Sequence, residues 1–175
     1  MEFDKERNND KEYVLEQVRK QGSLLDLVSD ELKDDKEVVM TAIEQDGNAL
    51  EFASKRLKDD KEVVLASVQK VGWTMCYASD RLRADKELML IAVRINGQEL
   101  YYASPDLRDN KETVLEAVTN KGLIVKYASK RLRADKEIML AAIKSDKRAK
   151  EYFSDQTLLE DEEIKQALEL SLIHI

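Results

Sequence analysis

The sequence has little of what disulfides, tight turns and acid–base catalysis require. It contains one cysteine, Cys76, so no disulfide can form within the chain. One proline and five glycines in 175 residues are too few for a turn-rich β protein. The one histidine, His174, stands next to the last residue, so the rest of the chain lacks the usual general base near neutral pH.

Other absences narrow the classes of function. No apolar run approaches the roughly 20 residues of a membrane span, and no signal peptide opens the chain, so we expect a cytoplasmic protein without a membrane partner. The net charge of −7 argues against a nucleic-acid partner. There is no CxxC, HExxH, Gly-rich phosphate loop or GxSxG. We therefore expect no enzyme, and no catalytic residue, cofactor or metal ligand.

A repeat of 25 residues is the strongest pattern that is present. Units such as DKEVVMTAIEQDG and DKEVVLASVQKVG recur without a gap, and all five glycines share one repeat position. The six units begin at Asp10, Asp35, Asp60, Asp85, Asn110 and Asp135. The organisation predicted is a frayed leader at 1–9, six tandem repeats at 10–160, and a partial seventh repeat or terminal helix at 161–175.

Each unit is predicted to form two helices. Asp34 or Asp59, three residues before a glutamate, gives a capping box at the start of the first helix. The repeated glycine is expected to close this helix in the left-handed conformation, which glycine enters cheaply. A shorter second helix follows. The serine of the next Ser-x-x-Leu is predicted to be a helix cap and not a nucleophile, because it recurs in every unit.

Short helical pairs of this kind cannot bury an apolar face alone, whereas stacked neighbours can. The predicted fold class is therefore all-α, a helical-repeat solenoid of 25-residue helix-turn-helix units. The pattern DKEVVLAAV…G…ALEYAS…L…DKEVVL resembles a helical-repeat family known as domain of unknown function 4116, in which two such units form one module. The resemblance covers Asp10 to about Glu160. It implies an all-helical repeat architecture, and it implies no activity, cofactor or catalytic residue.

The C-terminal stretch EDEEIKQALELSL allows three interpretations. It resembles a ubiquitin-interacting motif, in which an acidic run precedes the residues that would contact ubiquitin: Ile164, Ala167, Leu168 and Ser171. Alternatively, LSLIHI at Leu170–Ile175 is a direct translation of CTGTCTCTTATACACATC, which resembles a transposase adapter used for sequencing libraries. The native frame would then end near Glu169, inside a truncated seventh repeat, and this is the interpretation we favour. The third interpretation is a native capping helix.

Basic residues also recur every 25 positions, at Lys33, Lys58, Arg83, Arg108 and Arg133. Such a row could track phosphates, as helical-repeat RNA readers do. Acids follow each of these residues within a few positions. We therefore favour a ladder of exposed ion pairs with the start of the next helix, each of which stabilises little.

Positions that vary between units are the candidates for a binding surface, because positions needed by the core stay fixed. The first and fourth residues after the glycine are polar in the end units but apolar or aromatic in the middle units, at Trp73, Cys76, Tyr101 and Leu123. Ile95 departs from polar counterparts in the same way. We predict that the first four form one surface patch across three units, since exposed aromatic residues are typical of binding hot spots. In the alternative, Trp73 fills a gap between helices.

These observations predict a non-catalytic helical-repeat scaffold for protein–protein interaction, whose partner the sequence does not identify. Two alternatives remain open. One is a ubiquitin-binding adaptor that uses the C-terminal helix, and the other is the recognition part of a larger, truncated protein.

Overall fold

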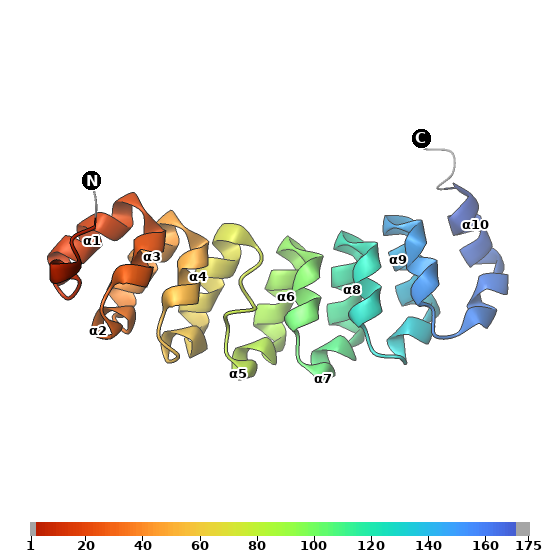
Figure 1. Ribbon diagram of the computed structural model, residues 1–175. Helices are drawn as coiled ribbons and strands as arrows, with labels where there is room; N and C mark the ends of the chain where they lie inside the picture. Colours follow the sequence, from red (N-terminus) through yellow and green to blue (C-terminus); the bar gives the residue numbers. More distant parts are fainter. Residues whose placement is uncertain (1–2, 171–175) are drawn as a thin grey trace. The chain divides into compact units, whose positions relative to one another are not determined.

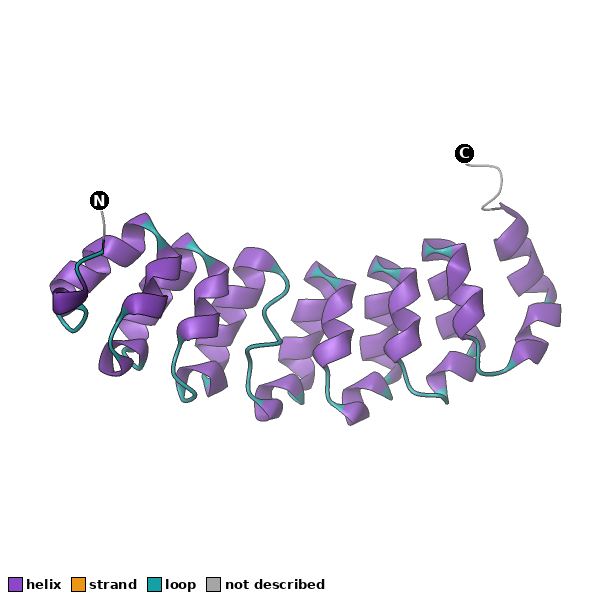
Figure 2. Ribbon diagram, in the orientation of Figure 1, coloured by secondary structure: helices purple, strands orange, loops and turns teal. Residues whose placement is uncertain are grey.

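The computed structural model describes residues 3–170, and every regular element in that part of the chain is a helix (Figure 2). The predicted all-α tandem repeat is confirmed. The chain divides into two compact units, an N-terminal unit at Met1–Arg83 and a C-terminal unit at Ala84–Ile175. Each unit is described by itself.

In the N-terminal unit three long helices open the repeats, and α3 packs against both of the others (Figure 1). They are α1 (Lys11–Lys20), α3 (Lys36–Gln45) and α4 (Lys61–Val71). The shorter elements are α2 (Asp30–Lys33), α5 (Asp80–Arg83) and 3₁₀ helices at Lys5–Arg7, Gly22–Leu27, Gly47–Phe52 and Leu57–Asp59.

In the C-terminal unit consecutive long helices again pack side by side (Figure 1). They are α6 (Lys86–Ile95), α8 (Lys111–Asn120), α9 (Lys136–Ser145) and α10 (Glu162–Leu170). The shorter elements are α7 (Pro105–Arg108) and 3₁₀ helices at Gly97–Tyr102, Gly122–Tyr127, Leu132–Ala134, Lys147–Tyr152 and Gln156–Glu160. A typical repeat thus has three helical elements where the sequence predicts two, because the Ser-x-x-Leu segment forms a short helical turn of its own.

The long helices begin after a capping aspartate or asparagine. Asp35 accepts hydrogen bonds from the backbone N–H groups of Glu37 (3.0 Å) and Val38 (3.2 Å), which have no partner inside the helix. The cap predicted at Asp34 is therefore wrong by one residue. The Asp34 carboxylate instead accepts a hydrogen bond from Ser54 in the next repeat.

The repeated glycine also differs from its predicted role as a left-handed cap. Four of the five begin a 3₁₀ helix without a positive φ: Gly22, Gly47, Gly97 and Gly122. At Gly122 a Cβ would lie 2.2 Å from the carbonyl oxygen of Ala142 in the next repeat. Gly22 and Gly97 approach the corresponding alanine carbonyls in the same way. Glycine is therefore needed here because two backbones come close together.

Gly72 is the exception, and its repeat lacks the second helix. Its φ is 68°, and its N–H donates to the Val68 carbonyl at 2.8 Å. Helix α4 therefore extends to Val71 and ends in the left-handed cap, and the residues after Gly72 form bends and turns. At the Val71 position other repeats have polar residues such as Asp46, whose side chain caps the 3₁₀ helix that follows. A valine side chain cannot accept this bond, but the missing bond does not by itself explain the missing helix, because Gln21 and Lys121 make no such bond and are still followed by 3₁₀ helices.

A serine–aspartate–arginine contact joins neighbouring repeats. The Ser129 hydroxyl donates to Asp109, while its oxygen accepts from the backbone N–H of Leu132 at 3.2 Å. Arg131 Nε lies 3.1 Å from the same carboxylate. Ser129 thus binds both the start of its own helical turn and the preceding repeat. This contact, which we call the clasp, recurs as Ser54–Asp34–Arg56 and Ser79–Asp59–Arg81. The predicted role of the serine as a helix cap is confirmed at Ser29 and Ser104.

The N-terminal residues are not frayed from Phe3 onward, in contrast to the predicted leader at 1–9. Phe3 is 7% exposed, and its ring centroid lies 5.6 Å from that of Tyr13. Asp4 caps a short 3₁₀ helix by accepting from the N–H of Glu6. Residues 3–9 thus resemble the end of a repeat, as in 28–34.

At the other end, α10 begins as the long helices of the repeats do. Asp161 accepts from the backbone N–H groups of Glu163 and Ile164, and this agrees with a seventh repeat that starts at Asp161. The adapter interpretation concerns Leu170–Ile175, of which 171–175 lie outside the described residues.

Candidate functional site

The five predicted partner-binding residues belong to two different units. Trp73 and Cys76 lie in the N-terminal unit, whereas Ile95, Tyr101 and Leu123 lie in the C-terminal unit. Trp73 is 59% exposed, Tyr101 51% and Ile95 45%, while Cys76 and Leu123 are half-buried. Three of the five are therefore exposed large apolar residues. The single patch that would join both units stays a prediction.

The alternative role of Trp73, to fill a gap between helices, is wrong, because more than half of the residue is exposed. Trp73 directly follows the left-handed Gly72 and belongs to no helix, so the helical face predicted for it is absent. The next residue, Thr74, is fully buried, and its hydroxyl lies 2.8 Å from that of Ser67. This buried pair anchors the turn, while Trp73 beside it remains exposed.

Tyr101 lies in a cluster of aromatic rings within the C-terminal unit. Its ring centroid is 4.9 Å from that of Tyr102 and 4.8 Å from that of Tyr127, with edge-on geometry in both pairs. The Lys126 ammonium lies 4.8 Å from the Tyr127 centroid. About half of Tyr101 stays exposed despite these contacts. An exposed tyrosine is typical of a contact surface for proteins.

Ile95, the last residue of α6, stands where three other repeats have a hydrogen-bond acceptor and the remaining two have lysine. At this position Asn120 accepts from the N–H of Gly97 at 2.9 Å, and Ser145 accepts from that of Gly122 at 2.9 Å. An isoleucine cannot accept such a bond, and 45% of Ile95 is exposed. Ile95 thus lacks the hydrogen-bond acceptor found at this position in three other repeats, and its side chain is not buried in the core.

The ubiquitin-binding alternative requires an exposed apolar face on α10. Ile164, the first residue of that face, is fully buried, and α10 packs against α9. Ala167 and Leu168 are half-buried, and Ser171 lies outside the described residues. Ile164 matches Ile138, which is likewise fully buried in α9. The burial of Ile164 contradicts its predicted contact with ubiquitin, because this side chain belongs to the repeat core.

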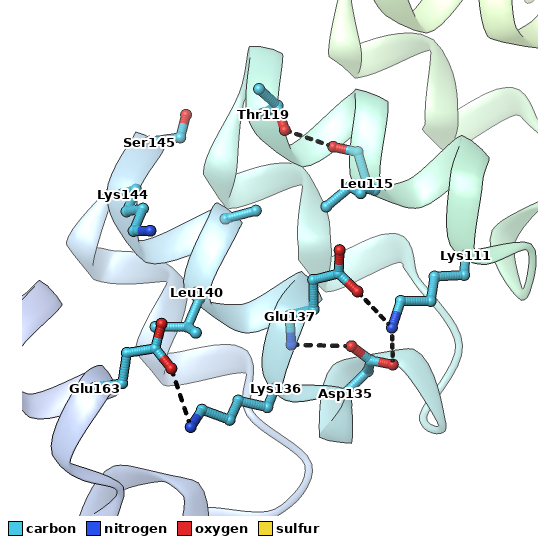
Figure 3. Close-up of a pocket in the computed structure, with 11 residues that line it drawn as sticks. Lys111, Leu115, Thr119, Asp135, Lys136, Glu137, Leu140, Lys144, Ser145 and Glu163 are labelled. Carbon is cyan, nitrogen blue, oxygen red and sulfur yellow. Dashed lines mark hydrogen bonds and ion pairs between the residues drawn. The ribbon is translucent and has the colours of Figure 1, made fainter.

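A groove of about 940 Å³ crosses α8, α9 and α10 in the C-terminal unit (Figure 3). Leu115 of α8 and Leu140 and Ala141 of α9 supply its aliphatic lining. Thr119 and Ser145 line it nearer the carboxyl ends of α8 and α9. The charged residues that line it are Lys111, Asp135, Lys136, Glu137, Lys144 and Glu163.

Two lysines of this groove each bridge a pair of carboxylates. Lys111 Nζ lies 2.8 Å from both Asp135 and Glu137, as the dashed lines in Figure 3 show. We call such an arrangement of one ammonium and two carboxylates a rung. The second rung of the groove consists of Lys136, Asp161 and Glu163. By contrast, Lys86 pairs with Glu112 alone, since Asn110 stands where other repeats have the aspartate.

The lysine and the aspartate of each rung stay ionised near neutral pH. Hydrogen bonds from the Lys111 ammonium to Asp135 and then to Glu137 raise the pKa of Lys111 above 10.5. Burial acts to raise the pKa of Asp135, but the hydrogen bonds from Lys111 and from the backbone N–H of Ile138 outweigh it and lower this pKa below 3.8. Each rung therefore has a net charge of −1.

The sequence does not reveal this groove, because its aliphatic residues look like core residues. One repeat position is apolar in all six units: Leu15, Met40, Leu65, Leu90, Leu115 and Leu140. The first five of these are half-buried, whereas the residue directly before each is fully buried. Consecutive apolar residues such as Val38 to Met40 cover a wider face than one neighbour buries, and that excess is the available signal.

The basic row differs from the predicted ladder of exposed pairs. Its members are half-buried. Lys58 donates to the carbonyl of Glu51 at 2.6 Å, and Arg83 pairs with Asp80 of its own short helix. Desolvation by burial lowers the pKa of Lys58. Ion pairs with the start of the next helix are instead made by the rung lysines.

Among residues 3–170, no cluster of three His, Cys, Asp or Glu side chains could hold a metal ion. In the same range, no helix is long and apolar enough to span a bilayer. The family model Domain of unknown function (DUF4116) matches residues 9–58, 60–108 and 110–164. Each match covers two of the 25-residue repeats. No curated protein and no solved structure matches the chain.

Proposed function

This chain belongs to the DUF4116 family, and we propose that it is a non-catalytic helical-repeat scaffold that binds another protein. The exposure of Trp73, Tyr101 and Ile95 carries the proposal. Most other repeats have a polar residue at the corresponding positions, such as Asn48 or Glu51. A large apolar side chain with no role in the core is typical of a contact with a partner.

The state of the acidic residues supports binding over catalysis. Hydrogen bonds from Ser129 and then Arg131 lower the pKa of Asp109 below 3.8, and the clasp residues Asp34 and Asp59 have lowered pKa values as well. A general acid or base works best with a pKa near the working pH. These carboxylates hold repeats together and are poorly suited to proton transfer. A cytoplasmic location is part of the proposal, since a lone cysteine suits a reducing compartment.

Affinity capture with matched variants tests the proposal. The bait would be the full chain, with Trp73→Ser and Tyr101→Ser as test variants. Gln98→Ser is the control, because Gln98 is exposed, polar and three residues from Tyr101 in the sequence. Quantitative mass spectrometry should find proteins retained by the wild type and by Gln98→Ser but lost by the test variants. Identical protein sets from all four baits, each with an unchanged melting temperature, would refute the proposal.

A further inference from the structure

We infer that Arg108 and Arg133 bind an extended acidic segment of a partner protein, each through one carboxylate of that segment. The inference rests on the proposed protein-binding function, and it adds a contact site and the chemistry of the partner. Both arginines lie in the C-terminal unit, and they occupy the same position of the basic row in consecutive repeats.

The two guanidinium groups lack a partner within residues 3–170. Nε of Arg108 and Nε of Arg133 are buried and have no hydrogen-bond acceptor there. The terminal nitrogens of both groups also make no hydrogen bond or ion pair with these residues, and they are accessible to solvent. Buried N–H groups are seldom left without an acceptor, and a half-buried charge without a counterion is costly. An anion at the terminal nitrogens compensates the whole guanidinium, because its charge is delocalised.

The sequence explains why these two members of the basic row are unpaired. In the preceding repeat Arg83 pairs with Asp80, three residues before it. The position of Asp80 holds Pro105 in the next repeat and Lys130 in the one after. Neither residue can accept a hydrogen bond through its side chain. Two consecutive repeats therefore lack the internal counterion that Arg83 has.

The acids near the two arginines do not compensate them. Asp109 directly follows the first arginine, but its carboxylate is bound in a clasp. Asp135 lies two residues after the second arginine and is bound by Lys111 in a rung. Asp106 is exposed and makes no ion pair within the part of the chain that the structure describes. The segment 130–133 has three basic residues and no acid, so the local charge is most positive around the second arginine.

The surroundings favour an acidic peptide over a nucleic acid. The net charge of the chain is −7, and the clasp and rung carboxylates beside the arginines would repel a continuous chain of phosphates. A carboxylate needs only one guanidinium, with which it forms a strong charge-assisted hydrogen bond. Two separate arginines therefore suit a peptide with two separate carboxylates.

The spacing of the repeats predicts the pattern of acids in the partner. Each arginine stands three residues before a long helix, α8 or α9, and these helices pack side by side. Axes of packed helices typically lie about 8–10 Å apart. An extended segment in the polyproline II conformation rises about 3.1 Å per residue with three residues per turn. Acidic side chains at i and i+3 thus lie about 9 Å apart on one side of the segment and match the two arginines.

Synthetic peptides test the inference on the purified full chain by fluorescence anisotropy. The first peptide is a labelled proline-rich segment with glutamates at i and i+3, and the second has glutamines in their place. The first peptide should bind at least tenfold more tightly than the second, and added salt should weaken its binding. Equal affinities for the two peptides would overturn the acidic partner.

Two further probes separate the carboxylate from other anions. They are a peptide with phosphoserine at i and i+3 and a short oligouridine. Binding of the phosphoserine peptide alone would show that the assignment to carboxylates is wrong. Oligouridine that binds as tightly as the first peptide would show that the assignment to a peptide is wrong.

Matched variants locate the contact. Arg108→Gln and Arg133→Gln should each reduce the affinity for the first peptide severalfold. Lys33→Gln, at the same repeat position in the N-terminal unit, removes one positive charge and should leave the affinity unchanged. Arg108→Lys and Arg133→Lys keep the charge and should retain more affinity than the glutamine variants, and they replace a glutamine variant that folds poorly. Affinity that is unchanged in both glutamine variants would overturn the site.

The inference and the proposed function fail in distinguishable ways. If no peptide binds while capture of a cellular partner still depends on Trp73 or Tyr101, the inference is wrong and the proposed function stands. If the first peptide binds at the two arginines but capture is insensitive to Trp73 and Tyr101, the surface on which the proposed function rests is wrong.

Discussion

The carbonyl oxygen of Ala142 lies 2.2 Å from the point at which a Cβ on Gly122 would stand. One repeat thus presents a backbone without a side chain to the backbone of the next. Gly122→Ala must therefore push α9 away from the preceding 3₁₀ helix. We expect a loss of about 1–3 kcal/mol in the free energy of unfolding, the usual cost of an overpacked interior, measured by urea denaturation.

Gly47→Ala is the matched comparison. The three atoms nearest to its new Cβ would be side-chain atoms of Val71 and Lys70, the closest at 2.9 Å. Side chains shift more easily than a helix backbone, so this variant should lose less stability than Gly122→Ala. The reverse order would show that the close approach to Ala142 is not what requires glycine.

A clasp should be transferable to a junction that lacks one. Ala84 and Asp106 are 22 residues apart, the spacing of Asp109 and Arg131, and Ser104 is already in place. The double variant Ala84→Asp, Asp106→Arg should raise the melting temperature by about 2 °C, in line with an exposed ion pair in a chain of this size.

The single variants control this experiment. Ala84→Asp alone brings a new carboxylate toward Asp106, so it should give no gain, and Asp106→Arg alone lacks the carboxylate. Additive effects of the two single changes in calorimetry would show that no clasp forms.

Acid should weaken the clasps only at low pH, because the pKa values of the clasp aspartates lie below that of a free aspartate. Hydrogen bonds from Ser129 and Arg131 lower the pKa of Asp109 below 3.8 in the folded state. Stability from such a group is present above the unfolded pKa of about 3.9 and is lost as pH falls through the folded pKa. The melting temperature should be nearly constant from neutral pH to about pH 5 and fall below about pH 4. In Asp109→Asn this fall should be smaller, and an unchanged acid limb would contradict the assignment.

Ile164→Ala should destabilise the chain although the residue lies close to the C-terminus. The side chain is fully buried, and truncation of a buried isoleucine costs about 2–5 kcal/mol. Truncation of Glu169, an exposed residue of the same helix, should cost little. A ubiquitin-binding surface residue would show the opposite, a loss of binding without a loss of stability, and thermal unfolding of both variants separates the two cases.

The architecture was accessible from the sequence because the 25-residue register and the helical period point to the same buried positions, as at Val39. The role of Gly122 could not be predicted from the sequence, since a left-handed cap and a close backbone approach both require glycine. Neighbouring aspartates likewise hide their roles, and only the geometry separates the cap Asp35 from the clasp residue Asp34.

One part of the candidate site was likewise predictable from the sequence, and another part was not. The exposure of Trp73 follows from its difference from polar counterparts in other repeats. The groove at Leu115 and Leu140 could not be predicted from the sequence, because the pattern alone does not distinguish an apolar residue that recurs in every repeat from a core residue.

The rungs also govern how two copies of the chain meet. Each has a net charge of −1, and with Lys144 the groove keeps a net charge of −1, so two C-terminal units that approached groove to groove would bring like charges together. This repulsion falls as salt shortens its range. An aliphatic groove that would otherwise favour self-association is thus protected against it at low ionic strength. Glu137→Lys would remove that protection and leave the aliphatic residues in place. Self-association of this variant in dilute buffer should therefore increase, and light scattering would measure it.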